Sequence, residues 1–217
     1  MIFINFKTYK EATGPGALSL FVLAAEVAKE EGIEIIVCPQ EVDLRKTLEI
    51  EGVKVWAQHI DAVIQGKSTG WFPPEVAKEV GVKGVLLNHS EHKISAGELG
   101  ETLSKTKEVG LKNLVFTDGL EEARVVSQFE PDYIGYEPPE LIASPDTSVA
   151  RAKPNVVRNV VTELPNSKII VGAGIKDKND VEVSLELGAV GVALSSAFVL
   201  AENPKEVLSQ LAKGFNK

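Results

Sequence analysis

One stretch decides how the fold is read: Tyr133-Ile134-Gly135-Tyr136-Glu137-Pro138-Pro139-Glu140-Leu141-Ile142. The alternating apolar run from Tyr133 to Tyr136 predicts a short strand, and that strand ends on a carboxylate, Glu137. Two prolines follow, so the chain cannot continue directly into a helix. A carboxylate at the end of a buried strand, beneath a loop with a stiff hinge, suits a general base under a lid. Taken alone, the stretch also fits a glutamate in a surface salt bridge.

Short β-branched runs alternate with helical patterns on both sides of this stretch. The predicted strands are residues 2–6, 33–37, 53–58, 83–88, 113–117, 133–136, 168–171 and 190–194. Among the helices between them, one is expected over 42–50, and Asp177 and Asn203 are expected to cap two others, the second with Glu206 in a capping box. Eight strand–helix units without a linker predict one α/β domain over residues 1–217, a closed (β/α)8 barrel of parallel strands ringed by helices. A doubly wound open sheet is the alternative.

Composition excludes several classes of protein. The 217 residues are 44% hydrophobic and 25% charged, which gives ample core for independent folding. The net charge is −8 and no basic block reaches five residues, which argues against nucleic acid and anionic membrane as partners. The only cysteine, Cys38, rules out an intrachain disulfide, and the first residues show no signal-peptide pattern, so a cytoplasmic location is expected. No apolar run reaches transmembrane length.

Polar residues gather at the ends of the predicted strands. They are Asn5 and Lys7 after the first strand, His89 and Glu91 after the fourth, Glu137 after the sixth, Gly172-Ala173-Gly174 after the seventh and Ser195-Ser196 after the eighth. In a parallel barrel these ends meet at one mouth, and the turns after strands seven and eight commonly bind phosphate there. A short helix predicted over 195–199 would present free N–H groups to the anion. Each feature alone has an ordinary structural explanation, but together they predict an active site.

These motifs resemble the triosephosphate isomerase family, in its short archaeal form. The resemblance spans the chain and rests on Asn5-Phe6-Lys7, Ala57-Gln58-His59-Ile60-Asp61, Leu87-Asn88-His89-Ser90-Glu91, Glu137-Pro138-Pro139-Glu140-Leu141-Ile142 and Gly172-Ala173-Gly174. It implies a TIM barrel that interconverts dihydroxyacetone phosphate and D-glyceraldehyde 3-phosphate through an enediol(ate), in glycolysis and gluconeogenesis. It implies no metal and no organic cofactor.

The resemblance also implies catalytic roles. Glu137 would move the carbon-bound proton, and a neutral His89 would polarise the carbonyl. Asn5 would donate to a substrate oxygen, and Lys7 would offset the charge of enediolate and phosphate. His89 is expected at the start of a short helix, whose positive end disfavours imidazolium.

Supporting and phosphate-binding roles follow from the same resemblance. Glu91 would orient Lys7, and Ser90 would hold Glu137 while the lid is open. The expected phosphate contacts are Ile142 and Ala143 in the lid, Gly172, Ala173 and Gly174, and Ser195 and Ser196.

Three positions depart from the family pattern. Ile142-Ala143-Ser144-Pro145 stands where the lid usually reads Ile-Gly-Thr-Gly, Ser195-Ser196 stands where many members have Gly-Gly, and His92 replaces a common arginine. The altered lid and serine pair keep open the alternative of a catalytically silent barrel that binds a phosphorylated metabolite. Another phosphate-binding barrel enzyme, such as a synthase or an epimerase, is a third hypothesis, against which the four catalytic candidates argue.

The sequence also bears on oligomerisation and on two motif-like segments that are rejected as binding sites. Family members are dimers and archaeal relatives often tetramers, so a homo-oligomer is expected, with the loop 59–72 as dimer contact and the segment 95–129 as any tetramer contact. Gly66-Lys67-Ser68-Thr69 lacks the upstream glycine of a P-loop. His89, Glu91 and His92 are too close in one loop for a metal site of known spacing.

Overall fold

Eight parallel strands form a closed barrel at the centre of the molecule. The computed structural model describes residues 1–138 and 148–216. The strands are β1 (Ile2–Asn5), β2 (Ile35–Cys38), β3 (Lys54–Ala57), β4 (Gly84–Leu87), β5 (Lys112–Thr117), β6 (Tyr133–Tyr136), β7 (Ile169–Val171) and β8 (Gly191–Leu194), paired in chain order. β1 pairs with β8 in the register Ile2↔Val192, which closes the ring. The predicted TIM barrel is confirmed, and the open-sheet alternative is wrong.

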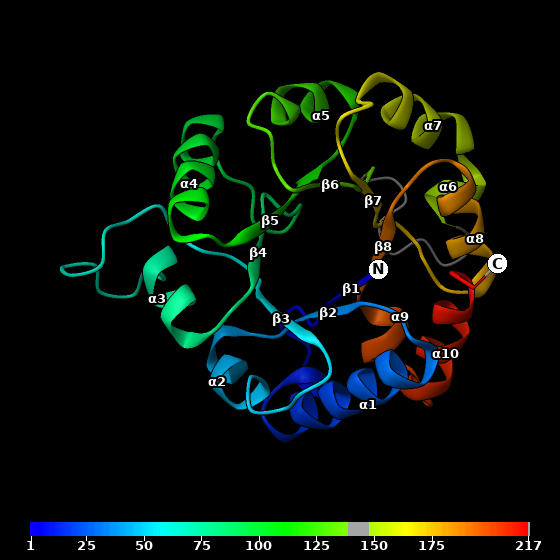
Figure 1. Cartoon of the computed structure of the whole chain (residues 1–217), viewed down its shortest axis with the longest axis horizontal. Coiled ribbons are helices and arrows are strands. Elements are labelled where there is room, and N and C mark those ends of the chain that lie inside the picture. Colours follow the sequence, from blue (N-terminus) through cyan, green and yellow to red (C-terminus); the bar gives the residue numbers. More distant parts are fainter. Residues whose placement is uncertain (139–147, 217) are drawn as a thin grey trace.

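Helices surround the strands, as Figure 1 shows in a view that places the ring of strands at the centre. They are α1 (Pro15–Glu31), α2 (Leu44–Thr47), α3 (Pro74–Val80), α4 (Ala96–Val109), α5 (Leu120–Ser127), α6 (Val149–Ala152), α7 (Pro154–Glu163), α8 (Lys178–Glu186), α9 (Ser196–Val199) and α10 (Pro204–Lys213), with short 3₁₀ turns η1 (Lys10–Ala12) and η2 (Glu41–Asp43). None of the helices in the described ranges combines the length and apolar composition needed to cross a membrane.

Two local predictions about these helices need correction. The helix expected over 42–50 is split into η2 and the single turn α2, where the Thr47 hydroxyl donates to the carbonyls of Asp43 and Leu44 and so competes with regular helix bonding. At α10, the Asn203 side chain accepts from the N–H of Glu206, but the Glu206 carboxylate accepts from Asn203 Nδ2 and not from the backbone. The capping box there is therefore only half formed, whereas Asp177 forms a complete one with Asp180.

The barrel interior is filled with side chains. Its buried cluster consists of Phe3, Ile36, Cys38, Trp56, Leu86, Leu114, Phe116, Ile170 and Ala193. A Cβ at Gly84 would overlap the Trp56 ring, and one at Gly135 would overlap the Phe116 ring. The two glycines therefore leave the space that these aromatic rings occupy inside the barrel. This part of the barrel interior is therefore apolar.

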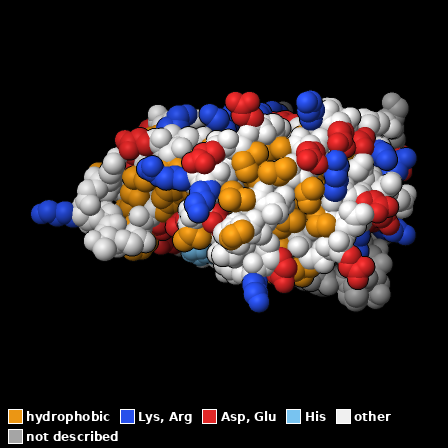
Figure 2. All heavy atoms as spheres, turned by 90° about the horizontal axis from the view of Figure 1, so that it is seen from below, with side chains coloured by type: hydrophobic (Ala, Val, Ile, Leu, Met, Phe, Trp, Pro, Cys, Tyr) orange, Lys and Arg blue, Asp and Glu red, His pale blue; other side chains and the backbone are white. Residues whose placement is uncertain are grey.

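The outer surface is charged and mixed. In the space-filling view of Figure 2, lysine, arginine and acidic side chains are interspersed with small apolar areas on the face shown. Neither sign of charge dominates that face.

Candidate active site

A cavity of about 240 Å³ lies at the carboxyl ends of the strands. Its lining residues are Asn5, Lys7, Tyr9, His89, Phe116, Glu137, Gly172, Gly174, Ile175, Lys176, Ala193, Leu194, Ser195, Ser196 and Ala197. The structure thus brings together eight of the residues predicted from strand ends. Ala173 is buried beside the cavity, Ser90 and Glu91 lie outside its lining, and Ile142 and Ala143 fall outside the described residues. Sequence reasoning missed Lys176, although it follows the Gly172–Gly174 turn closely.

Glu137 is a buried carboxylate at the end of β6. Its side chain is only 10% exposed, and burial raises its pKa from the ordinary 4.5 to about 7, against the opposing pull of Lys7. A Cβ at position 172 would overlap the Glu137 carboxylate. Gly172, expected only as part of a phosphate turn, therefore also provides the space in which this carboxylate sits. A carboxylate with a pKa near neutrality can accept a proton and return it.

His89 faces Glu137 across the cavity, with its Nε2 3.5 Å from Glu137 Oε2. The backbone N–H of Glu91 donates to His89 Nδ1 over 3.2 Å, so Nδ1 acts as acceptor and the ring proton is placed on Nε2, towards the cavity. Burial and the charge of Lys7 lower the pKa of His89 to about 4. The ring is therefore a neutral hydrogen-bond donor at neutral pH.

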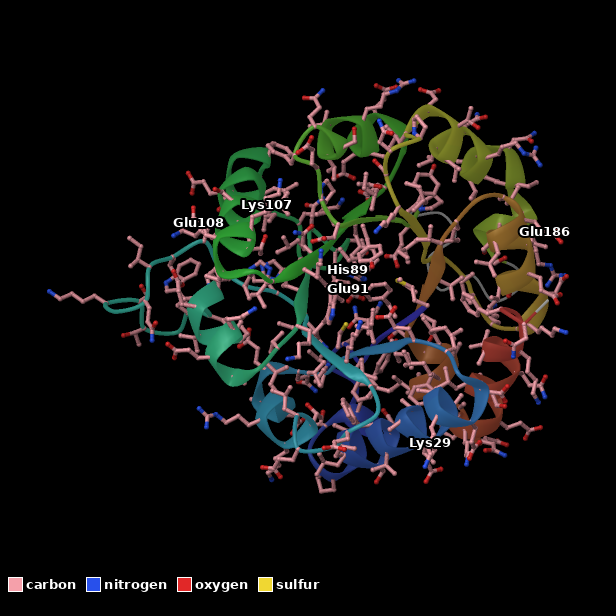
Figure 3. The ribbon with its side chains drawn as sticks, viewed as in Figure 1. Lys29, His89, Glu91, Lys107, Glu108 and Glu186 are labelled. Carbon is pink, nitrogen blue, oxygen red and sulfur yellow. The ribbon has the colours of Figure 1, made fainter. Side chains whose placement is uncertain are left out.

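The predicted helix start at His89 is wrong. His89 lies in a turn, closed by the N–H of His92 donating to the His89 carbonyl, and the next helix, α4, begins only at Ala96 after the Ser95 cap. The neutral state expected from a helix dipole comes instead from burial, from Lys7 and from the backbone donor on Nδ1. Figure 3 shows His89 and Glu91 together near the barrel axis.

Lys7 adopts a left-handed backbone conformation (φ 47°), which is unusual for a residue with a side chain. Its N–H donates to Asn5 Oδ1 over 2.9 Å, and Gln58 Nε2 donates to its carbonyl over 2.9 Å. Its ammonium donates to Glu91 Oε1 over 2.7 Å, which agrees with the expected orientation of Lys7 by Glu91. The strained conformation is thus held by its neighbours. One of them is Gln58, which belongs to a motif quoted for the resemblance but was given no role from the sequence. In the described part of the chain Asn5 Nδ2 keeps its donor capacity, since Oδ1 alone is engaged.

The serines near the cavity are placed differently from one another. Within residues 1–138 and 148–216, Ser90 makes no hydrogen bond to Glu137, which faces His89 instead. Ser195 and Ser196 lie at the start of α9, as the predicted short helix over 195–199 implies, and both line the cavity. The Ser195 hydroxyl is buried and has no hydrogen-bond partner among the residues that the structure describes.

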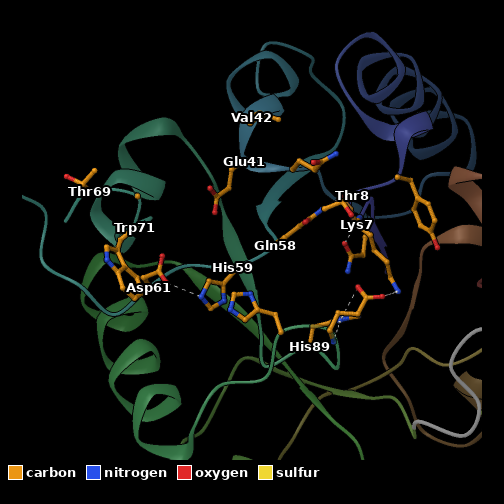
Figure 4. Close-up of a pocket in the computed structure, with 16 residues that line it drawn as sticks. Lys7, Thr8, Glu41, Val42, Gln58, His59, Asp61, Thr69, Trp71 and His89 are labelled. Carbon is orange, nitrogen blue, oxygen red and sulfur yellow. Dashed lines mark hydrogen bonds and ion pairs between the residues drawn. The ribbon is translucent and has the colours of Figure 1, made fainter.

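A larger cavity of about 1150 Å³ adjoins the first, on the side of β1 to β4 (Figure 4). It shares Asn5, Lys7, Tyr9 and His89 with the smaller cavity and extends to Trp71 in the loop 59–72. His59 and His92 stack there with ring centroids 4.1 Å apart, and His59 Nε2 lies 3.3 Å from Asp61 Oδ1. In the described ranges no group of three or more His, Cys, Asp or Glu side chains could hold a metal ion.

Comparison with known proteins identifies the family to which the chain belongs. The family model described as triosephosphate isomerase matches residues 1–116 and 99–213. The triosephosphate isomerase of Methanothermus fervidus is 41% identical over 215 residues, which are 97% of this chain and 96% of the relative. That of Methanocaldococcus jannaschii is 40% identical, with 98% and 99% covered, and that of Methanopyrus kandleri is 41% identical, with 98% and 96% covered. This chain belongs to the triosephosphate isomerase family, a family of isomerases.

Proposed function

We propose that this protein interconverts dihydroxyacetone phosphate and D-glyceraldehyde 3-phosphate through an enediol(ate), as a step of glycolysis and gluconeogenesis in the cytoplasm. The observation that carries the proposal is the pair His89 and Glu137, a neutral imidazole N–H 3.5 Å from a buried carboxylate at the end of a closed barrel. The cavity of about 240 Å³ has room for a three-carbon phosphorylated sugar.

Glu137 acts as the base in this reaction. Its carboxylate takes a proton from the carbon next to the carbonyl. The electron pair of the broken C–H bond forms the carbon–carbon double bond of the enediolate, and the π pair of the carbonyl moves onto its oxygen. Returning a proton to the neighbouring carbon, together with transfer of the hydroxyl proton from one oxygen to the other, completes the isomerisation without a net gain or loss of atoms or electrons. Because burial raises the pKa of Glu137 to about 7, the group is a stronger base than an exposed carboxylate and is still ionised at neutral pH to a useful extent.

His89, Lys7 and Asn5 stabilise the charge that develops on oxygen. The Nε2–H of His89 donates to the carbonyl oxygen, and because the ring is neutral it can pass this proton between the two substrate oxygens. Lys7 places a positive charge beside the enediolate in a protein whose net charge of −8 opposes an anionic substrate. The amide donor of Asn5 supplements it.

The phosphate group is proposed to lie at the turns after β7 and β8. Gly172 and Gly174 line the cavity after β7, and Ser195 and Ser196 line it at the start of α9, after the neighbouring strand β8. The backbone N–H groups at the first turn of a helix have no partner within the helix and suit an anion. The lid residues Ile142 and Ala143 are proposed as further contacts.

The pH dependence of the reaction tests the assignment of base and acid. kcat/KM is expected to fall with slope one as the pH drops through about 7, because Glu137 becomes protonated, while His89 stays neutral down to about pH 4. The measurement is a coupled assay across the pH range, corrected for the substrate phosphate, whose second proton is lost at pH ~6. An acid limb at the ordinary carboxylate pKa of 4.5 would contradict the buried base.

A homo-oligomer is proposed, either a dimer formed through the loop 59–72 of each chain or a tetramer that adds contacts of the segment 95–129, with residues 1–217 as one domain. This loop projects beyond α3 and α4 in Figure 1, and Asp61 closes its base by accepting from the N–H of Phe72. The loop exposes large apolar side chains, with Ile64 75% and Trp71 58% exposed. The 1150 Å³ cavity beside it is where the loop of a second copy would insert.

Sedimentation velocity tests the assembly. The wild-type chain is expected to sediment as a dimer or tetramer at micromolar concentration, and Trp71→Asp is expected to dissociate it, because burying a charge in an interface is costly. Val22→Asp, which changes an exposed apolar side chain on α1, serves as the control. A wild-type monomer at that concentration would rule out this interface.

A further inference from the structure

The loop that carries His89 begins with a strained residue. Asn88 directly follows β4 and has a φ of 56°, in the left-handed region that residues with side chains rarely adopt. It is 97% buried, and both its side-chain oxygen and its side-chain nitrogen are hydrogen-bonded. Asn88 Oδ1 accepts from the N–H of Ile94, while Nδ2 donates to the Phe116 carbonyl and to Glu122 Oε1, both over 2.9 Å. Asn88 therefore joins the two ends of the loop 88–94 and ties them to α5.

A second contact with α5 comes from the far end of the same loop. Lys93 Nζ lies 2.9 Å from Glu122 Oε1, 3.0 Å from Glu122 Oε2 and 2.9 Å from Asp118 Oδ1. Glu122 Oε2 also accepts from the N–H of Asp118 over 2.7 Å. Although burial opposes it, these hydrogen bonds and the charge of Lys93 lower the pKa of Glu122, so it is ionised at neutral pH. The Glu122 carboxylate thus contacts both ends of the loop 88–94, which carries His89.

Glu122 has no place in the chemistry itself. It lines neither the 240 Å³ nor the 1150 Å³ cavity, and its carboxylate contacts Asn88, Lys93 and Asp118, none of which lines them either. The bond that sets the tautomer of His89, from the N–H of Glu91 to Nδ1, lies between the two anchor points of the loop. The strength of that bond depends on how firmly the loop is held.

We propose that Glu122 is a positioning residue for His89. It holds the loop 88–94 in the one conformation that directs the Glu91 N–H at Nδ1 and the ring N–H at Glu137. The inference rests on the proposed function for its kinetic consequence, but its structural consequence, a single tautomer of His89, stands without it.

Removal of the carboxylate tests the proposal kinetically. Glu122→Ala is expected to lower kcat about 10- to 100-fold with a small change in KM, because a displaced ring weakens the transition state more than substrate binding. Glu121→Ala is the matched control, since Glu121 stands on the same turn of α5 and pairs with Arg124 instead. The control is expected to keep wild-type kinetics.

Nitrogen NMR of the histidines measures the tautomer and the titration of His89, which would not change if Glu122 only stabilised the fold. The chain has only three histidines, so His89 can be assigned by substitution of the other two. In the wild type His89 is expected to be neutral, with its proton on Nε2, at about pH 5.5, between its pKa of about 4 and the ordinary 6.5. Glu122→Ala is expected to show averaged tautomers and a titration closer to the ordinary value. The charged groups around the ring are Lys7, Glu91, Lys93, Asp118 and Glu137, and all of them remain in this variant.

Two further variants keep the test decisive if Glu122→Ala does not fold. Glu122→Gln keeps an acceptor for Asn88 and loses the charge opposite Lys93, so an intermediate loss of kcat is expected. Lys93→Met removes the other anchor and is expected to average the His89 tautomers as well; because Lys93 itself lowers the pKa of His89, the tautomer and not the titration is the readout in this variant. Because Glu122 and Lys93 contact each other, the effects of Glu122→Ala and Lys93→Met on kcat are expected to be non-additive when the two changes are combined.

A lower melting temperature with an unchanged His89 spectrum and wild-type kcat would overturn the proposal. An altered spectrum in a chain without isomerase activity would instead refute the proposed function alone.

Discussion

Glu137→Gln is expected to lower kcat by about 10²- to 10⁴-fold, the range that a positioned general base contributes. Glutamine fills the same space over Gly172 and keeps an oxygen near His89, but it cannot accept the carbon-bound proton at neutral pH. A coupled assay with glyceraldehyde 3-phosphate measures the loss. A purified Glu137→Gln variant with kcat within a few-fold of wild type would remove Glu137 from the role of base.

The same substitution is expected to stabilise the fold at alkaline pH, which separates lost chemistry from lost structure. The pKa of Glu137 is raised from 4.5 to about 7, so the folded chain disfavours its ionised form. The resulting cost begins above pH 4.5, grows up to about pH 7 and is constant above it. A tenfold change in proton affinity is worth about 1.4 kcal/mol, so the neutral glutamine should increase the free energy of unfolding at alkaline pH by roughly 3 kcal/mol. Denaturant unfolding of both proteins at about pH 8.5 and about pH 4 measures this, with the gain expected only at the higher pH.

Lys7→Met is expected to reduce kcat/KM by about 10²- to 10³-fold, because a single preorganised donor to a developing oxyanion is worth roughly 3–4 kcal/mol. Methionine keeps most of the apolar stem of Lys7 while removing the charge near His89 and Glu137. Since Lys7 lowers the pKa of both groups, the acid limb of the kcat/KM profile should also move to higher pH in this variant.

Lys10→Met is the matched control for Lys7→Met. Lys10 is exposed in η1, three residues further along the same loop, and does not line either cavity. Both changes alter the net charge of −8 by the same amount, so a general charge effect would lower both rates alike. A loss below tenfold in Lys7→Met, or an equal loss in the control, would contradict a direct role for the ammonium.

The barrel and the placement of the site could be predicted from the sequence because both depend on local signals. Each strand is a short apolar run bounded by a turn signal, and eight of them in alternation with helices leave few topologies. Polar residues directly after those runs, such as Asn5 and Glu137, must then share one mouth. Periodicity and turn residues are local features of a few positions each, so the strands, their order and the residues at the mouth can be predicted from the sequence.

The environment of His89 could not be predicted because it depends on contacts across the fold. Ser90-Glu91-His92 resembles the first turn of a helix, but the chain turns back there, and the cap that starts α4 is Ser95 with Glu98, a capping box that the sequence does show. The contact of Glu122 with Asn88 joins two different β–α units, and no periodicity reports such a pair.

Gly172 illustrates the same limit. Its place in Gly172-Ala173-Gly174 indicated a turn beside phosphate, whereas its packing shows that it makes room for a carboxylate from the neighbouring strand. A sequence pattern gives the conformational freedom of a glycine, but it does not show which side chain approaches it.

Exchange of the carbon-bound proton with solvent tests the central claim most directly. Wild-type protein incubated with dihydroxyacetone phosphate in D₂O is expected to yield glyceraldehyde 3-phosphate and to place deuterium on the carbon next to the carbonyl, because Glu137 exchanges the proton it holds. Glu137→Gln should show almost no incorporation. If the wild-type protein binds the sugar phosphate but leaves its carbon-bound hydrogen untouched, the barrel binds a phosphorylated metabolite without catalysing its isomerisation, and the pair formed by Glu137 and His89 is not an acid–base catalyst.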